Sequence, residues 1–170
     1  MSSYVGRTRL AYSRAWHLVD LSKDPRPLGR LASSIALTLM GKNKPIWNPS
    51  TDCGDYVVAV GCHDVHTTGK KRFQKKYYSH TTRPGSLKEI TMDKLIDKWG
   101  GSEVLRRAVR GMLPKNRLRD ERMARLKTFE GHIHPYKHNI LKIRHQPGPL
   151  PVIEAAASKT PAPPIQKASP

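Results

Sequence analysis

Two short apolar runs are the clearest strand signals along the chain. The first is "WHLVD" at 16–20, and the second is "YVVAV" at 56–60, which Gly61 closes. The run at 56–60 is continuously apolar, which is typical of a strand covered on both faces, as in a parallel sheet. "DVHTTGKK" at 64–71 is expected to add a short strand and a turn.

Two segments show helical spacing of their apolar residues. The first starts near Pro27 and stops at Gly41, the usual placement of proline and glycine around a helix. Its apolar positions are Leu28, Leu31, Ala32, Ile35 and Leu39. The second follows Thr91, which can cap it, and stops at Gly100–Gly101. Its apolar stripe consists of Met92, Leu95, Ile96 and Trp99.

A third helix is predicted after Ser102, which can cap it, and a fourth from about Arg117. Pro114 ends the third helix, because proline disfavours helical geometry at the residue before it. Met112 and Leu113 are expected to anchor this helix end in the core. The other inward positions are Val104, Leu105, Ala108 and Val109. Strands alternating with helices predict an α/β fold.

The two ends of the chain differ in composition from its middle. The stretch "MSSYVGRTRLAYSRAWHLV" contains no acid and three serines, which is typical of a mitochondrial transit peptide or of a basic arm that contacts RNA. The end is rich in Pro, Ala and Ser and is expected to be extended. We therefore divide the chain into an arm at 1–15, a domain at 16–145 and a Pro/Ala-rich tail at 146–170.

Charge narrows the class of partner. The chain of 170 residues has a formal net charge of +18 and a pI near 10.3. Such an excess repels itself unless a polyanion neutralises it, and nucleic acid is the usual partner, with an anionic membrane surface second. Two cysteines make no disulfide framework, which favours a reducing compartment. No apolar stretch approaches the roughly 20 residues that span a membrane.

The first basic cluster is "TGKKRFQKKYYSHTTRPG" at 68–85. No acid occurs between Asp64 and Glu89, and aromatic residues alternate with the cations. Cations neutralise phosphates and aromatic faces stack on unpaired bases, so we favour RNA contact by a basic loop or hairpin. The alternative is a solvated lysine face with the tyrosines in the core.

The second basic cluster extends from Leu105 to His145. Its densest part is "RGMLPKNRLRDERMARLKTFEG" at 110–131, where a small apolar turn precedes the cations. Pro114 fixes where Lys115, Asn116 and Arg117 leave the helix, and the start of the next helix also favours a phosphate. Asp120 and Glu121 can form ordinary pairs along that helix, so part of this cluster is surface chemistry.

A metal-assisted enzyme, such as a nuclease, is the competing hypothesis. It would use Asp52, Asp55, His63 and His66, with Cys53 and Cys62 nearby. The spacing matches no zinc motif, and a turn role for the two aspartates is the simpler interpretation. Phosphate-loop and dinucleotide motifs are also absent from the sequence. We therefore expect no enzyme activity, no metal, no cofactor and no small-molecule substrate.

Five ordered segments resemble the universal large-subunit ribosomal protein 13 family in its bacterial and organellar form. They are "WHLVD" (16–20), "LGRLAS" (28–33), "GKNKPIWNPSTDCGDYVV" (41–58), "TGKKRFQKKYYSHTTRPGSLKEIT" (68–91) and "AVRGMLPKNRLRDERMARLKTFEGHIHPY" (108–136). The resemblance implies a three-layer α/β/α domain around a small, mainly parallel sheet. It implies a non-catalytic protein that binds large-subunit ribosomal RNA, touches neighbouring large-subunit proteins and helps the subunit to assemble.

Mapped onto this chain, the resemblance and the two basic clusters give one set of expected RNA-binding residues. The set is Lys42, Lys44, Lys70, Lys71, Arg72, Lys75, Lys76, Tyr77, Tyr78, His80, Arg83, Arg110, Lys115, Asn116, Arg117, Arg119, Arg122, Arg125, Lys127, His132, His134 and Lys137.

Departures from the family pattern bear on location. The chain adds the long tail, its arm lacks acids, and "RPGSLKEIT" carries one glycine where the family commonly has two. Arg119-Asp120-Glu121 stands where the family often has Gly-Arg-Ala. The additions around a bacterial-like core favour a mitochondrial ribosome, with the bacterial cytoplasm as the alternative.

Overall fold

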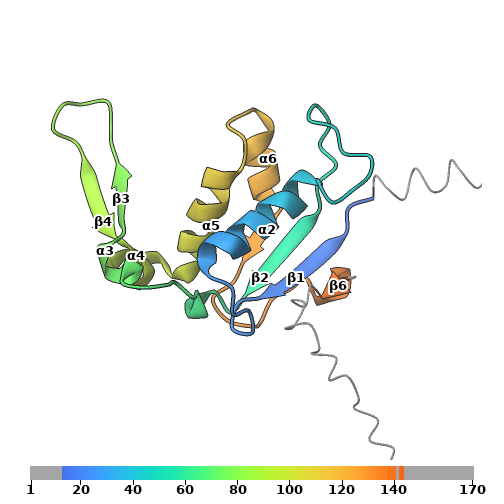
Figure 1. Ribbon diagram of the computed structural model, residues 1–170, viewed down its shortest axis with the longest axis horizontal. Coiled ribbons are helices and arrows are strands. Elements are labelled where there is room, and N and C mark those ends of the chain that lie inside the picture. The colour runs from blue at the N-terminus through green and yellow to red at the C-terminus, as the bar shows by residue number, and fades with distance from the viewer. Residues whose placement is uncertain (1–12, 141, 144–170) are drawn as a thin grey trace, which may run out of the picture.

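A four-stranded parallel sheet forms the centre of the protein (Figure 1). The computed structural model describes residues 13–140 and 142–143, so most of the predicted arm and all of the tail lie outside it. The strand order is β5–β2–β1–β6, and every neighbouring pair is parallel. The strands are β1 (Trp16–Asp20), β2 (Tyr56–Val60), β5 (Leu126–Thr128) and β6 (Lys142–Ile143). The predicted α/β class with a small, mainly parallel sheet is confirmed.

Strand β2 is buried on both faces, as its continuous apolar run predicts. Val57 and Ala59 belong to the main hydrophobic core, while Val58 and Val60 point to the opposite face. β2 pairs with β1 in the register Trp16↔Tyr56 to Asp20↔Val60. All four of these apolar side chains of β2 are buried, so the strand stabilises both layers that it touches.

Helices pack on one face of the sheet (Figure 1). They are α2 (Leu28–Met40), α5 (Gly101–Met112) and α6 (Leu118–Ala124). Leu39 of α2 and Leu105 and Val109 of α5 are fully buried between the helices and the sheet. Short helices α3 (Lys71–Gln74) and α4 (Met92–Trp99) follow at one end of this layer, and η1 (Cys62–Asp64) is a single 3-10 turn.

The other face of the sheet is covered by the 129–139 segment, which ends in the 3-10 turn η2 (Lys137–Asn139). Aromatic rings make this layer. The Trp16 ring stacks on Tyr56 with centroids 4.3 Å apart and on Tyr136 with centroids 5.1 Å apart. Phe129 lies beside Tyr136, so the return of the chain after β5 closes the second face.

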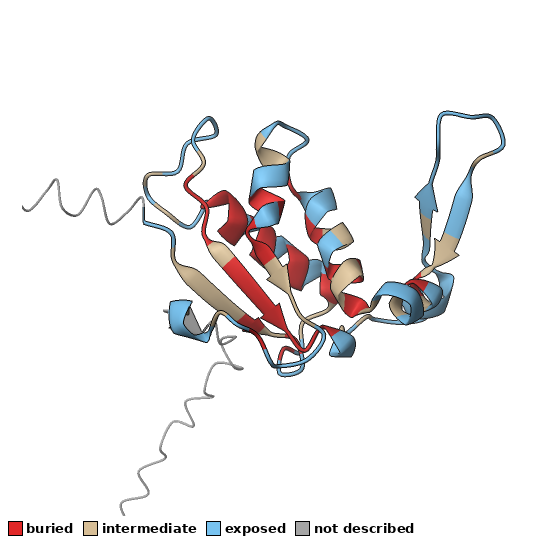
Figure 2. Ribbon diagram, turned by 180° about the vertical axis from the view of Figure 1, so that it is seen from behind, coloured by how far each residue is buried: buried red, intermediate tan, exposed pale blue. Residues whose placement is uncertain are grey.

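A two-stranded antiparallel hairpin projects from the body as a separate sheet (Figures 1 and 2). It consists of β3 (Lys76–Ser79) and β4 (Lys88–Thr91), and we call residues 76–91 the arm hairpin. Only its base touches the core, through Tyr77 and Ile90. The remainder is largely exposed, as Figure 2 shows. The expected loop or hairpin is therefore a hairpin for the second half of the basic cluster at 68–85, whereas the first half of that cluster forms a turn and α3.

The prediction of a strand at 64–71 is wrong. Gly61 adopts a left-handed backbone with φ of 66°, and the chain turns there into η1 and later α3. The His66 carbonyl accepts a hydrogen bond from the Leu28 amide at 2.9 Å, so this segment docks on the start of α2 and not on the sheet. Local composition could not reveal that long-range contact.

The expected caps also need correction. Thr91 occupies the N-cap position of α4 but makes no capping hydrogen bond through its side chain. Ser102 does not cap α5, because α5 already begins at Gly101. The Glu130 carboxylate takes that role. It accepts hydrogen bonds from the backbone N–H of Ser102, with an N–Oε1 distance of 2.8 Å, and of Gly101, with an N–Oε2 distance of 3.2 Å. An acid 29 residues away in sequence therefore caps the helix.

The apolar turn after α5 is anchored by one residue and not by two. Leu113 is 3% exposed, whereas Met112 is 42% exposed. The prediction that Met112 points into the core is therefore wrong. Leu113 has an extended backbone with φ of −78° and ψ of 144°, the geometry that the following Pro114 favours.

Candidate nucleic-acid interface

Three segments that each carry at least one exposed basic residue project from the same edge of the protein (Figure 1). They are the loop at 41–55 after α2, the tip of the arm hairpin, and the turn at 113–117 between α5 and α6. We call this side the basic edge. The fold brings together cations that are more than 70 residues apart in the sequence, which neither cluster alone indicates.

Most predicted cations around the arm hairpin are exposed: Lys70, Lys71, Arg72, Lys75, Lys76, His80 and Arg83. Two of them have local partners. Lys76 pairs with Glu89 at 3.1 Å and Arg72 with Asp93 at 2.8 Å, both on exposed surface where such pairs stabilise little. The pairing with Glu89 also raises the pKa of Lys76, so this ammonium stays charged. All seven side chains remain accessible.

The two tyrosines of the hairpin have different environments. Tyr78 is 64% exposed and offers a free aromatic face. Tyr77 is partly buried at the hairpin base, and Lys75 and Arg107 both lie over its ring, each 5.6 Å from the centroid. Burial also raises the pKa of Tyr77. Only Tyr78 therefore retains the geometry for stacking on a base.

The turn between α5 and α6 presents its cations to solvent. Lys115, Asn116 and Arg117 are exposed, and Arg110 precedes them on the exposed side of α5. Arg119 and Lys127 are partly buried. Leu113 and Pro114 set the direction of this turn, so the predicted division between an apolar anchor and the cations holds with Leu113 as the anchor.

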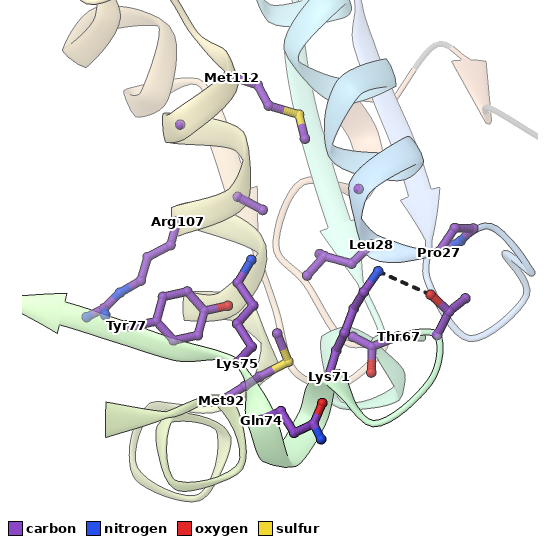
Figure 3. Close-up of a pocket in the computed structure, with 14 residues that line it drawn as sticks. Pro27, Leu28, Thr67, Lys71, Gln74, Lys75, Tyr77, Met92, Arg107 and Met112 are labelled. Atoms are coloured by element: carbon purple, nitrogen blue, oxygen red, sulfur yellow. Dashed lines mark hydrogen bonds between the residues drawn. The ribbon is translucent and has the colours of Figure 1, made fainter. Parts of the chain in front are cut away.

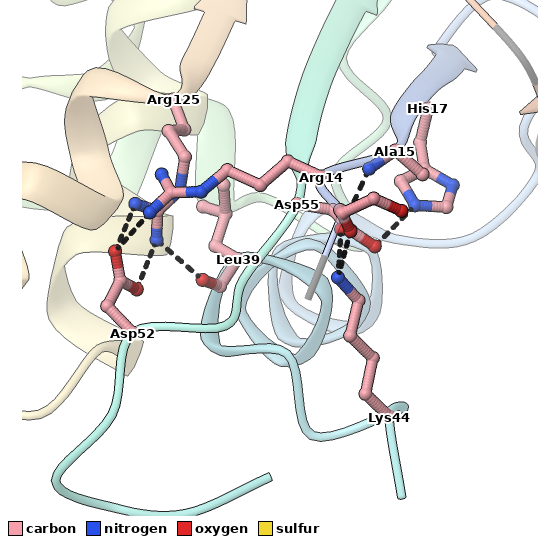
Figure 4. Close-up of polar contacts among 9 residues, drawn as sticks. Arg14, Ala15, His17, Leu39, Lys44, Asp52, Asp55 and Arg125 are labelled. Carbon is pink, nitrogen blue, oxygen red and sulfur yellow. Dashed lines mark hydrogen bonds and ion pairs between the residues drawn. The ribbon is translucent and has the colours of Figure 1, made fainter. Parts of the chain in front are cut away.

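Arg122 and Arg125 do not belong to this surface. Arg122 is 2% exposed and Arg125 is 4% exposed. Arg125 donates from Nη2 to Asp52 Oδ1 at 2.6 Å and to the Leu39 carbonyl at 3.2 Å (Figure 4). Arg122 Nε lies 3.7 Å from the same carboxylate. Both arginines are therefore structural, and their expected contact with RNA is corrected.

Asp52 compensates these buried charges. Burial alone would raise the pKa of Asp52, but the hydrogen bond from Arg125 and the charges of Arg125, Arg14 and Arg122 outweigh it, so the pKa lies below its ordinary value of 3.8. The adjacent Gly54 permits the close packing, because a Cβ there would lie 1.7 Å from the Leu39 carbonyl oxygen. The turn around Asp52 is thus an ion-pair centre.

Asp55 gathers a second set of partners beside the first (Figure 4). It accepts hydrogen bonds from the Ala15 amide at 3.0 Å and Lys44 Nζ at 2.6 Å, and His17 Nε2 lies 3.0 Å away. Burial would raise the pKa of Asp55, but hydrogen bonds from His17 and Lys44 lower it further than burial raises it. Lys44 is therefore committed to Asp55, whereas Lys42 is exposed and lies over Trp47 at 5.3 Å.

The remaining predicted positions follow β5. His134 is 7% exposed and lies beside the Phe129 ring, so it belongs to the aromatic layer. His132 is exposed and lies 3.8 Å from Asp20 Oδ1, and Lys137 is exposed. The predicted set omits Arg106, an exposed residue that lines a hollow with Tyr78 and Arg110 between the hairpin and α5. The sequence could have indicated Arg106, because it lies four residues before Arg110 and therefore on the same side of the predicted helix.

The residues of the metal-enzyme hypothesis contact other parts of the fold and do not form one site. Asp52 and Asp55 bind basic side chains, and His63 Nδ1 lies 2.8 Å from the Glu130 carbonyl oxygen. Burial, with the Glu130 charge, raises the pKa of Cys62 to about 12, which keeps its thiol protonated. Within residues 13–140 and 142–143, no group of three or more His, Cys, Asp or Glu side chains is placed to hold a metal ion.

No helix in the described part of the chain has the length and apolar character needed to cross a membrane.

Comparison with known proteins identifies the family. A protein named large ribosomal subunit protein uL13m from Neurospora crassa is 59% identical over 157 residues, covering 84% of this chain and 86% of that protein. Its namesake from Schizosaccharomyces pombe is 52% identical over 147 residues, covering 86% and 92%. Large ribosomal subunit protein uL13 from Citrifermentans bemidjiense is 48% identical over 124 residues, covering 73% and 85%. The family model for ribosomal protein L13 matches residues 14–135, and the chain belongs to this family.

Proposed function

We propose that the protein is a non-catalytic structural component of the large subunit of the mitochondrial ribosome, where it binds large-subunit ribosomal RNA and supports subunit assembly. The proposal is carried by two observations: the chain belongs to the ribosomal protein L13 family, and three segments with exposed cations project from one edge of the fold. Cations carried along one edge of an α/β body are suited to neutralising RNA phosphates.

The proposed contact set is the predicted set without the residues that serve the fold. Exposed cations neutralise phosphates, and Tyr78 offers the stacking surface. The buried or committed residues left out are Lys44, Tyr77, Arg122, Arg125 and His134. Lys71 and Lys75 are also left out, because they line a pocket together with apolar side chains. Arg106 is added from the structure. The set is Lys42, Lys70, Arg72, Lys76, Tyr78, His80, Arg83, Arg106, Arg110, Lys115, Asn116, Arg117, Arg119, Lys127, His132 and Lys137.

A mitochondrial location is favoured over a bacterial one by the relatives. The two fungal proteins of the mitochondrial form share 59% and 52% identity with the chain and cover more of it than the bacterial relative does. The acid-free N-terminal segment is consistent with import. We assign residues 16–145 to the RNA-binding domain. The N-terminal segment at 1–15 and the Pro/Ala-rich tail at 146–170 are additions at its two ends.

Sedimentation tests the proposal directly. Full-length tagged protein should co-sediment with large subunits from purified mitochondria at moderate salt, and high salt should release it together with other peripheral proteins. The purified chain should bind large-subunit RNA with an affinity that falls steeply as salt rises. Recovery only in fractions free of large subunits contradicts the proposed function, and recovery in cytosolic subunits contradicts the location.

A further inference from the structure

A pocket of about 700 Å³ opens at the base of the arm hairpin (Figure 3). The start of α2, helix α3, strand β3 and the outer side of α5 form its walls. We call it the α2–α5 pocket. It lies at the N-terminal end of α2, whereas the loop at 41–55 of the basic edge follows the C-terminal end of that helix.

Apolar side chains from three helices converge on this pocket. Met112 reaches into it from α5, Leu28 from the start of α2 and Met92 from α4 (Figure 3). Met92 is 1% exposed, but Met112 is 42% exposed because it faces the open pocket and not the core. Methionine side chains adapt their shape to an incoming apolar group, which makes them common at protein-binding surfaces.

The charged residues of the lining are all basic. Lys71, Lys75 and Arg107 line the pocket, and none of its lining residues is an Asp or Glu. Lys71 Nζ donates to Thr68 Oγ1 at 3.3 Å, and Lys75 Nζ lies over the Tyr77 ring. In the part of the chain that the structure describes, neither lysine has a carboxylate partner, whereas Arg107 already pairs with Glu103 at 2.8 Å.

The start of α2 adds to this positive field. Its first turn contains no acid, and no side chain caps it. The first amides of a helix carry partial positive charge, which favours a nearby carboxylate. Leu28 and Gly29 of this turn are part of the lining, so the helix start supplements the two lysines.

The chemistry of the walls favours a peptide over RNA. Unpaired bases are held by free aromatic faces, but the only aromatic ring in this lining is Tyr77, over which Lys75 and Arg107 lie. Thioether and aliphatic surfaces next to unpaired lysines complement an apolar side chain adjacent to a carboxylate.

We propose that the α2–α5 pocket is a docking site for an acidic, apolar segment of a neighbouring protein of the large subunit. The apolar side chain of that segment packs against Met112, Leu28 and Met92. Its carboxylate pairs with Lys71 and Lys75. The inference rests on the proposed function, because it places the chain next to other large-subunit proteins.

Photo-crosslinking in assembled subunits tests this site. Benzoylphenylalanine replaces Met112 in the full-length chain, large subunits are isolated and irradiated, and mass spectrometry identifies the crosslinked product. We expect a protein segment with an Asp or Glu within about four residues of the crosslinked apolar residue, the distance of one helical turn. Lys71→Glu/Lys75→Glu should lower the yield roughly five- to tenfold, as expected for the loss of two exposed charge contacts.

Lys94→Glu/Lys98→Glu is the matched control, because these exposed lysines of α4 have the same spacing and lie outside the pocket lining. It should leave the crosslink yield unchanged. A crosslink to RNA, a crosslink to a segment without acids, or subunits that contain the chain but give no protein crosslink would each overturn the inference alone. Absence of the chain from large subunits contradicts the proposed function itself, and the docking site falls with it.

Discussion

Arg125 at the end of α6 is held by Asp52 in the loop before β2, with Nη2 donating to Oδ1 at 2.6 Å and Nη1 to Oδ2. The two residues are 73 positions apart in the sequence. Because the Arg125 side chain is buried, its charge depends on this carboxylate for compensation. The pair therefore fixes the loop at 41–55 against the α6–β5 junction and sets the position of one part of the basic edge.

Removing the Asp52 charge should destabilise the fold. We expect Asp52→Asn to lower the free energy of unfolding by about 3 kcal/mol, since a buried guanidinium then lacks compensation. Urea denaturation followed by circular dichroism measures the change. Asp120→Asn is the control, because the Asp120 side chain is 84% exposed and its pair with Arg110 spans 3.7 Å. Equal effects of the two substitutions would contradict the assigned role of Asp52.

The same pair predicts a pH dependence. The pKa of Asp52 in the folded protein lies below 3.8, so its stabilising effect is complete above that pH and disappears as the pH falls through the lower folded value. The difference in stability between wild type and Asp52→Asn should stay constant between about pH 7 and pH 5 and narrow below about pH 4. Denaturation curves at several pH values test this. A difference that already shrinks near neutral pH would point to a histidine.

Leu113 and Met112 are neighbours with different expected effects. Leu113→Ala should lower stability by about 3 kcal/mol, because it removes a buried side chain and leaves a cavity. Met112→Ala should change it by less than about 1 kcal/mol, since Met112 lies in an open pocket. Thermal or urea unfolding of the two variants makes the comparison. A larger loss for Met112→Ala would show that the core extends into that pocket.

The turn at 113–117 should act through charge, with geometry second. We expect Lys115→Glu/Arg117→Glu to weaken RNA binding at least about tenfold and to reduce the slope of log affinity against log salt by about two. Pro114→Ala should weaken binding less and leave that slope unchanged, because it alters only the direction of the turn. Filter binding over a salt series measures both quantities.

Two comparisons check the cause of that loss. Lys23→Glu reverses a charge on a side chain that is 83% exposed, in the turn between β1 and α2 at the opposite end of the helix from the loop at 41–55. It should change RNA affinity little. Circular dichroism should show that the double variant still folds. If Lys23→Glu reduces binding as much, net charge and not the basic edge determines affinity.

Local pattern was sufficient to predict most helices and the two central strands. The apolar run of β2 and the helical spacing of α2 each depend on residues near one another in the chain, and burial then follows from periodicity. The turn before α6 was also predicted, because Pro114 constrains its neighbour through local sterics. These features need no knowledge of what packs against them.

Long-range contacts account for the errors. Arg122 and Arg125 belong to a segment rich in basic residues, which is typical of an RNA-binding helix. In the fold both are buried and pair with Asp52, which the sequence places far from them. Glu130 replaces Ser102 as the cap of α5 for the same reason. Charged residues near one another in sequence do not reveal which of them find partners in the fold, so sequence alone overestimates the number of exposed cations.

The arm hairpin has a thermodynamic consequence for assembly. Two-stranded ribbons are marginally stable alone, and above Tyr77 and Ile90 this one has no hydrophobic core to support it. Under the proposed function, we expect ordering of its tip to draw on the free energy of contact with RNA, whereas the loop held by Asp52 and the turn anchored by Leu113 need no such contact. The basic edge thus combines a preorganised part, which sets orientation, with an adaptable part, whose conformational entropy is lost only when the partner is correctly placed.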